Sequence, residues 1–123
     1  TKLIQQENPD FVIGYNIFGF DYTFMFIRAK ELKCEFEFLK LSRNRDQLCG
    51  KTDRDKPGEI MIEESSIVIA SGQHELQFIK MPGRIQIDLY NYFRRSVNLD
   101  QYKLDYVAGY FIGDGVTNIE TCE

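Results

Sequence analysis

Asn16 and Asp21 flank a short glycine-containing turn near the start of the chain, and their side chains could belong to a site. An apolar run ends at residue 15, and a helical pattern begins at residue 22. In α/β sheets, sites form beyond the carboxyl ends of strands, where backbone N–H groups and side chains of the next turn converge. A carboxylate there can accept hydrogen bonds or balance a positive charge. It can equally be the N-cap of the following helix, and spacing alone favours the cap.

The elements that must position these side chains follow from the apolar pattern. Residues 11–15 are apolar on successive positions, as expected for a central parallel strand covered on both faces. Residues 22–33 have helical spacing, with an inward stripe at i, i+4 and i+7. That stripe is Met25, Ala29 and Leu32, while Phe24 and Phe26 lie off it. The pattern predicts a strand, a turn and a helix in immediate succession.

The run from residue 16 to residue 29 resembles the second exonuclease motif of family B DNA polymerases. That motif has Asn, three residues, an aromatic and Asp, then an aromatic, an aliphatic and Arg-Ala. The matching residues are Asn16, Phe20, Asp21, Phe24, Met25, Arg28 and Ala29. Many members have Pro two residues after the Asp, where this chain has Thr23. The stretch looks most like delta-like polymerases of eukaryotes and large eukaryotic DNA viruses.

Two later segments extend the resemblance, which runs with gaps from about Asn8 to Gly113. Residues 83–89 match a Gly-Arg-x-x-x-Asp-Leu pattern, and residues 102–107 match Tyr-x-Leu-x-x-Val. The Asp of the first pattern is generally not a metal ligand in the family. Asp88 is therefore expected to end a strand and cap the next helix.

The resemblance implies an α/β, ribonuclease-H-like exonuclease fold, a mixed sheet with flanking helices and an inserted β-hairpin. The implied reaction is hydrolysis of the 3′-terminal phosphodiester with two Mg²⁺ or Mn²⁺ ions. By resemblance, Asp21 is a metal ligand and the catalytic carboxylate of this chain. Asn16 resembles the residue that positions the terminal nucleotide, and Phe20 packs beside the site.

One carboxylate cannot hold two metal ions, so the resemblance implies further ligands outside this chain. The family's first motif, Asp-x-Glu, would precede Thr1. Tyr110 and Asp114 have the spacing of the third motif, Tyr-x-x-x-Asp, but Gly113 breaks the helix that would align them. We therefore expect residues 1–123 to be part of an exonuclease domain, truncated at both ends and inactive alone.

Composition limits the partners. The net charge is −4 and the pI is about 5.1, which excludes a general polyanion binder but not local basic strips that contact DNA. No apolar run reaches membrane-spanning length, so no membrane partner is expected. The resemblance implies as partners a single-stranded 3′ primer end, primer–template DNA and the remainder of the polymerase chain, with a sliding clamp as a further candidate. The cysteines at positions 34, 49 and 122 indicate reduced intracellular thiols, and the expected location is the nucleus or a viral replication site.

The middle of the chain reads as an insertion over residues 42–82. Alternating apolar residues predict a strand at 35–41, and a charged loop rich in Lys and Arg follows at 42–58. Residues 59–81 predict β-structure with turns at 65–66 and 71–73, and His74 is expected on the hairpin surface. By similarity of position, this hairpin would help separate primer from template.

The last predicted helix covers residues 101–112, with Asp100 as its cap and Gly113 as its end. Its buried stripe is expected to be Leu104, Val107, Ala108 and Phe111.

Two other functions stay open at this point. One is a non-catalytic ribonuclease-H-like module that binds nucleic acid or a protein. The other is an unrelated α/β interaction domain in which Asp21 only caps a helix.

Overall fold

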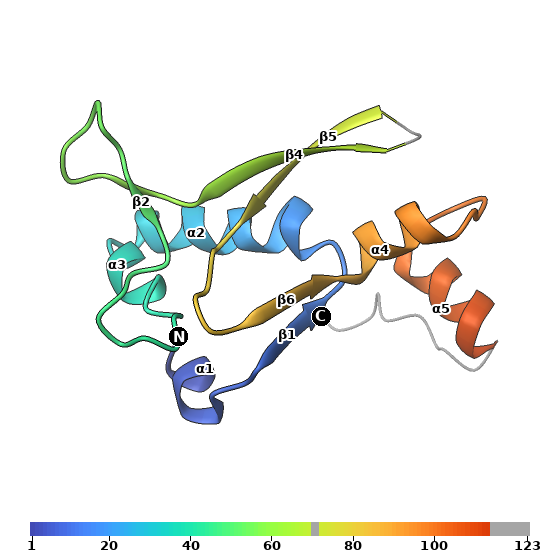
Figure 1. The fold of residues 1–123 in the computed structure, drawn as a ribbon, viewed down its shortest axis with the longest axis horizontal. Coiled ribbons are helices and arrows are strands. Elements are labelled where there is room, and N and C mark those ends of the chain that lie inside the picture. Colours follow the sequence, from blue (N-terminus) through green and yellow to red (C-terminus); the bar gives the residue numbers. More distant parts are fainter. Residues whose placement is uncertain (70–71, 114–123) are drawn as a thin grey trace.

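The structure is a computed structural model, and it describes residues 1–69 and 72–113 (Figure 1). The elements in chain order are α1 (Lys2–Glu7), β1 (Phe11–Gly14), the π-helical turn η1 (Ile17–Asp21), α2 (Tyr22–Glu31), α3 (Glu35–Phe38), β2 (Lys51–Thr52), β3 (Ile60–Met61), β4 (Glu63–Ile69), β5 (Gly72–Phe78), β6 (Ile85–Asp88), α4 (Leu89–Ser96) and α5 (Leu104–Ile112). The predicted mixed α/β organisation is confirmed, with small sheets. Within the described ranges, no helix has the length and apolar character needed to cross a membrane.

The parallel pair β1–β6 positions the turn that follows β1. Phe11 pairs with Ile85 at one end, and Gly14 pairs with Asp88 at the other. The predicted parallel pairing is therefore confirmed. Coverage of both faces is not, because Phe11, Ile13 and Ile85 are 54%, 58% and 56% exposed. The opposite face packs inward, through Val12, against the buried cluster.

Helix α2 lies between the β1–β6 pair and the β4–β5 hairpin (Figure 1). Its buried residues are Tyr22, Phe26 and Ala29. The predicted stripe is wrong in two of three positions, since Met25 is 41% and Leu32 61% exposed. Apolar side chains surround almost the whole helix, so periodicity alone could not select the buried face.

The core lies between α2 and the segment that follows it in the chain. Its buried cluster consists of Tyr22, Phe26, Leu39, Leu41, Cys49, Ile60, Ile62, Ile79 and Met81. The strand predicted at 35–41 is wrong, because residues 35–38 form the short helix α3. The N–H of Leu39 donates to the carbonyl of Glu35 at 2.9 Å. Four residues with two apolar positions fit one helical turn as well as a strand.

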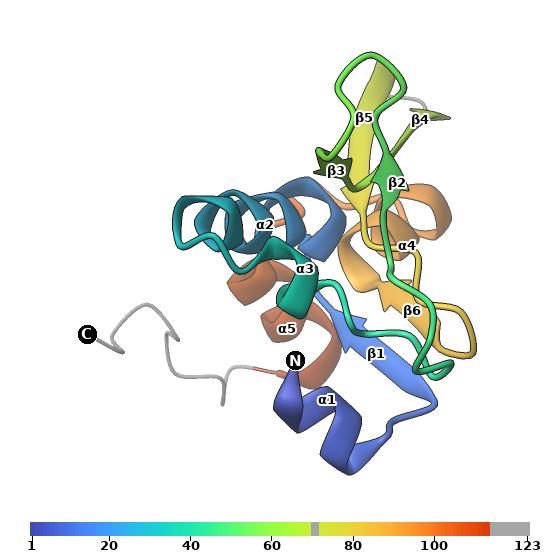
Figure 2. The ribbon, with the colours of Figure 1, turned by 90° about the vertical axis from the view of Figure 1, so that its left-hand side faces the viewer.

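The predicted hairpin is present as the antiparallel pair β4–β5, which projects beyond α2 (Figure 2). Ser65 and Ser66 lie inside β4, so the turn predicted there is wrong. Of the second predicted turn, at 71–73, Gly72 and Gln73 belong to β5, and residue 71 lies outside the described residues. His74 lies on β5, partly buried, with its Nε2 2.9 Å from the Arg94 guanidinium.

Helix α5 begins at Leu104, later than predicted, and Asp100 does not cap it because its N-cap position is Lys103. The preceding segment is instead held as a loop, in which the Tyr102 hydroxyl donates to the carbonyl of Val97 at 2.8 Å. Only Val107 of the predicted stripe is fully buried. Gly113 ends the helix with φ 97°, as predicted. Asp114 and Cys122 lie outside the described residues.

Candidate active site

The turn after β1 begins at Asn16, whose backbone is left-handed, with φ 60° and ψ 26°. Asn tolerates this conformation better than most residues. Its carbonyl accepts hydrogen bonds from the N–H groups of Gly19 and Phe20 at 3.2 and 3.1 Å. The chain therefore coils tightly from Asn16 through η1 directly into α2.

The carboxylate of Asp88 holds this turn from the neighbouring strand. It accepts hydrogen bonds from the backbone N–H of Asn16 at 2.7 Å and of Phe18 at 3.0 Å. It also accepts from the N–H of Tyr90 at 3.1 Å and from Nδ2 of Asn91 at 3.2 Å. Asp88 is 5% exposed, and four donors use the acceptor capacity of a carboxylate. Asp88 is thus the predicted helix cap, and its role in the site is structural.

Two glycines allow the turn to close. A Cβ at Gly14 would lie 2.4 Å from Cγ2 of Ile17, and one at Gly19 would lie 2.3 Å from Oδ1 of Asn16. The Asn16 carboxamide therefore rests against the Gly19 backbone. It makes no capping hydrogen bond to η1, and among the described residues it has no other hydrogen-bond partner.

Asp21 lies at the junction of η1 and α2 with helical dihedrals, φ −62° and ψ −45°. Its side chain makes no capping hydrogen bond, so the cap interpretation fails. In the described part of the chain, its carboxylate has no hydrogen-bond or ion-pair partner. The helix needs no cap there because it continues from η1.

An exposed aromatic pair lies beside Asp21. The rings of Phe20 and Phe24 stack with centroids 5.7 Å apart and planes 13° apart. Phe20 is 59% and Phe24 58% exposed, so much of this ring surface is open. Stacking on a nucleobase is the chemistry that such a surface offers.

Tyr22 lies on the other side of Asp21, in the core. It is 5% exposed, and its hydroxyl has no hydrogen-bond partner among the described residues. Burial raises the pKa of Tyr22 to about 12, with smaller contributions from the negative charges of Asp88 and Asp21. The phenol therefore stays neutral at the buried side of the site.

The described residues do not form a metal centre by themselves. Across residues 1–69 and 72–113, no group of three or more His, Cys, Asp and Glu side chains could hold a metal ion. Asp21 fits a hard divalent cation as one oxygen ligand, because its carboxylate is unpaired here. Any second and third ligands have to come from elsewhere.

The structure brings Asn16, Phe20 and Asp21 onto one turn, as the sequence predicted. What sequence reasoning missed is the bond from Asp88 to this turn. A signal existed, since Gly14 and Asp88 end two apolar strands, and parallel strands place their carboxyl ends at one edge.

Comparison with known proteins relates the chain to one family. The family described as DNA polymerase family B, exonuclease domain, matches residues 1–107. A DNA polymerase of Phaeocystis pouchetii virus is 51% identical over 120 residues, covering 98% of this chain and 11% of the relative. A DNA polymerase of Pyramimonas orientalis virus is 42% identical over 94% of the chain and 9% of the relative.

A third relative is cellular. The DNA polymerase delta catalytic subunit of Dictyostelium discoideum is 34% identical over 90% of this chain and 9% of the relative. The chain thus spans about a tenth of the length of these curated relatives. The chain belongs to the exonuclease-domain family of the family B DNA polymerases.

Proposed function

We propose that this chain is part of the proofreading 3′–5′ exonuclease of a DNA-directed DNA polymerase that replicates DNA, with a ribonuclease-H-like fold. The observation that carries the proposal is the Asp21 carboxylate. It has no partner among the described residues and lies on the turn that follows β1, the same turn that carries Asn16 and the exposed ring of Phe20. Asp88, the nearest alternative ligand on β6, is occupied by four hydrogen bonds.

Asp21 would hold a Mg²⁺ or Mn²⁺ ion, which supplies charge stabilisation and a hydroxide near neutral pH when bound as one of a pair. The other residues act on the DNA. The carboxamide of Asn16, held against Gly19, would bind the 3′-terminal nucleotide. The Phe20–Phe24 pair would stack on an unpaired base at that end and so orient the scissile phosphodiester.

The remaining metal ligands are proposed to come from other parts of a longer polymerase chain. The uncovered face of β1–β6 supports this, because Phe11, Ile13 and Ile85 together form an exposed apolar patch. We propose that further elements of the exonuclease domain cover this face. We also propose that residues 42–82 are an insertion whose hairpin, β4–β5, separates primer from template.

Substitution of Asp21 in the complete polymerase tests the proposal. Asp21→Asn keeps the shape of the side chain and removes its charge. Excision of a mismatched 3′ nucleotide should fall by about 100-fold or more, with polymerisation unchanged. Because Asp21 makes no cap bond, the stability of the domain should change by less than about 0.5 kcal/mol. Glu31→Gln, which alters an exposed carboxylate at the other end of α2, is the matched control.

Retained excision in Asp21→Asn would favour the alternative function, a module that binds nucleic acid or protein without cutting. The isolated 123-residue chain gives a second check. With Mg²⁺ and single-stranded DNA it should show no cleavage, because the described residues contain no group of three or more side chains that could hold a metal ion. Asp21-dependent cleavage by that chain would contradict the proposal that the other metal ligands come from outside it.

A further inference from the structure

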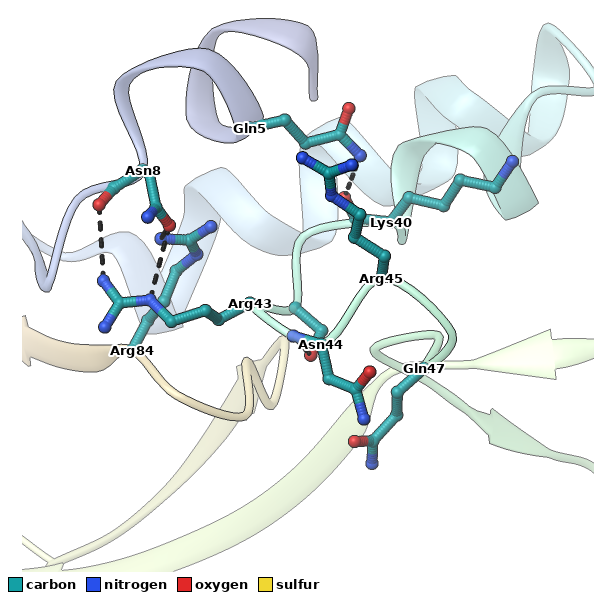
Figure 3. A pocket seen from close by; sticks show the side chains of 9 residues that line it. Gln5, Asn8, Lys40, Arg43, Asn44, Arg45, Gln47 and Arg84 are labelled. Atoms are coloured by element: carbon teal, nitrogen blue, oxygen red, sulfur yellow. Dashed lines mark hydrogen bonds between the residues drawn. The ribbon is translucent and has the colours of Figure 1, made fainter.

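A polar cavity of about 510 Å³ lies at the amino ends of β1 and β6 (Figure 3). Its walls come from Gln5 of α1, from Asn8, from residues 40–47 and from Arg84, which immediately precedes β6. The candidate active site lies at the carboxyl ends of the same two strands, roughly 13 Å along a four-residue strand. The cavity is therefore separate from the Asn16–Asp21 turn, and its chemistry does not depend on the proposed nuclease activity.

Three arginines line this cavity, and none of its lining side chains is Asp or Glu. The most buried is Arg84, which is 8% exposed. Its guanidinium donates to the carbonyls of Leu41 at 3.0 Å and Pro9 at 2.6 Å, and to Oδ1 of Asn8 at 3.0 Å. All these acceptors are neutral, and Arg84 has no carboxylate partner among the residues described. A buried cation without a counterion favours an anion nearby.

Several hydrogen bonds hold the exposed Arg43 side chain at the rim. Its guanidinium donates to Oδ1 of Asn8 at 3.3 Å, to the carbonyl of Pro9 at 3.2 Å and to Oδ1 of Asp10 at 2.6 Å. Asn8 thus joins Arg43 and Arg84 through one amide oxygen (Figure 3). Asp10 neutralises Arg43 in part, but its carboxylate is not in the lining of the cavity.

Arg45 completes the set. Its exposed side chain reaches toward Gln5 across the loop (Figure 3), and it has no partner in the ranges that the structure covers. The fourth cation of the lining, Lys40, pairs instead with Glu37. Arg45 and Arg84 are therefore two guanidinium groups without a counterion, in a chain whose net charge is −4.

We propose that this cavity binds a phosphate group. Planar guanidinium groups match the oxygens of a phosphate better than an ammonium does, and a phosphate would compensate the charges of Arg45 and Arg84. The amides of Gln5, Asn44 and Gln47 in the lining offer further donors. The phosphate can be a phosphodiester of a nucleic-acid strand or free phosphate, because both present the same oxygens to the arginines.

The test is arginine footprinting of the complete polymerase with phenylglyoxal, without divalent metal so that no cleavage occurs. Inorganic phosphate should slow modification of Arg45 several-fold relative to chloride at equal ionic strength. Arg54 is the internal control, because it belongs to the same basic loop but not to the cavity. Protection of neither residue, or equal protection of both, would overturn the proposal. So would an Arg45 that is unreactive before phosphate is added, since the cavity would then be filled by protein.

A second arm separates the two sources of phosphate. If a strand is the ligand, a single-stranded oligonucleotide should protect Arg45 at lower concentration than phosphate does. Arg45→Gln should then reduce the slope of log affinity against log salt by about 0.7, and Arg54→Gln should not. If the oligonucleotide leaves Arg45 reactive while phosphate protects it, free phosphate is the ligand. Either result supports a phosphate site, and neither changes with Asp21→Asn.

Discussion

The Oδ1 atom of Asp88 lies 2.7 Å from the backbone nitrogen of Asn16, 72 residues away in the sequence. This bond ties the end of β6 to the start of the turn that carries Asp21. Asn16 is left-handed at that point, and its N–H points across the sheet edge toward the carboxylate. The geometry of Asn16, Phe20 and Asp21 therefore depends on a carboxylate of another strand, which is engaged in four hydrogen bonds.

Asp88→Asn is expected to loosen the turn without removing a metal ligand. An amide can replace one acceptor oxygen, but its NH₂ would face backbone donors that the carboxylate now satisfies. The domain should lose about 3 kcal/mol of stability. Hydrogen exchange of the complete polymerase should show faster exchange in residues 14–20 and in α4. Asp105→Asn, at an exposed carboxylate on α5, is the control.

The Mg²⁺ concentration needed for excision should distinguish the role of Asp88 from that of Asp21. Asp21→Asn should raise the Mg²⁺ concentration needed for excision, or abolish excision at any concentration. Asp88→Asn should lower the rate while leaving the Mg²⁺ requirement unchanged. A large shift in that requirement for Asp88→Asn would show that Asp88 is itself a ligand.

Local patterns predicted the strand, turn and helix that carry Asp21 better than they predicted the packing around them. The strand, the turn and the helix around Asp21 are each marked by a short run of residue types, and Asp88 is marked by its place at the end of a strand. The buried face of α2 was not readable, because Phe24, Met25 and Phe26 offer apolar surface in several directions. Which of them is buried depends on the 35–81 segment that packs there, and periodicity carries no information about that partner.

Gly19→Ala should displace the Asn16 side chain, since the new Cβ would lie 2.3 Å from Oδ1 of Asn16. Excision should fall about as far as in Asn16→Ala, and the double variant should be no worse than Asn16→Ala alone. The measurement is a double-mutant cycle on single-turnover excision rates. Gly109→Ala is the control, because a Cβ there meets open space. Additive losses would mean that Gly19 acts independently of Asn16.

Phe20→Ala should weaken binding of an unpaired 3′ end. Loss of one stacking ring costs about 1–3 kcal/mol per base, which raises the Kd by about 5- to 150-fold. The fluorescence of a 3′-terminal 2-aminopurine, measured without metal, reports this directly. Phe36→Ala is the matched control, since Phe36 is 45% exposed on α3 and lies outside the turn. Equal losses in both variants would argue against a stacking site at Phe20.

Because of the buried Tyr22 phenol, we expect the stability of the folded domain to depend on pH above pH 10. Burial, followed by the charges of Asp88 and Asp21, raises its pKa from 10.0 to about 12. Above pH 10 the unfolded chain releases the phenolic proton while the folded chain keeps it. The contribution of Tyr22 to stability is therefore complete below pH 10 and is lost as the pH rises toward about 12.

Tyr22→Phe isolates this contribution. The ring volume is kept and the hydroxyl, which has no partner among the described residues, is removed. At pH 7 the variant should be as stable as the wild type or up to about 1 kcal/mol more stable. Between pH 10 and 12, hydrogen exchange in α2 should accelerate less in the variant than in the wild type. Marked destabilisation at pH 7 would instead show that the hydroxyl makes a bond, and Asp21 or Asp88 would be the acceptor to examine because their charges act on it.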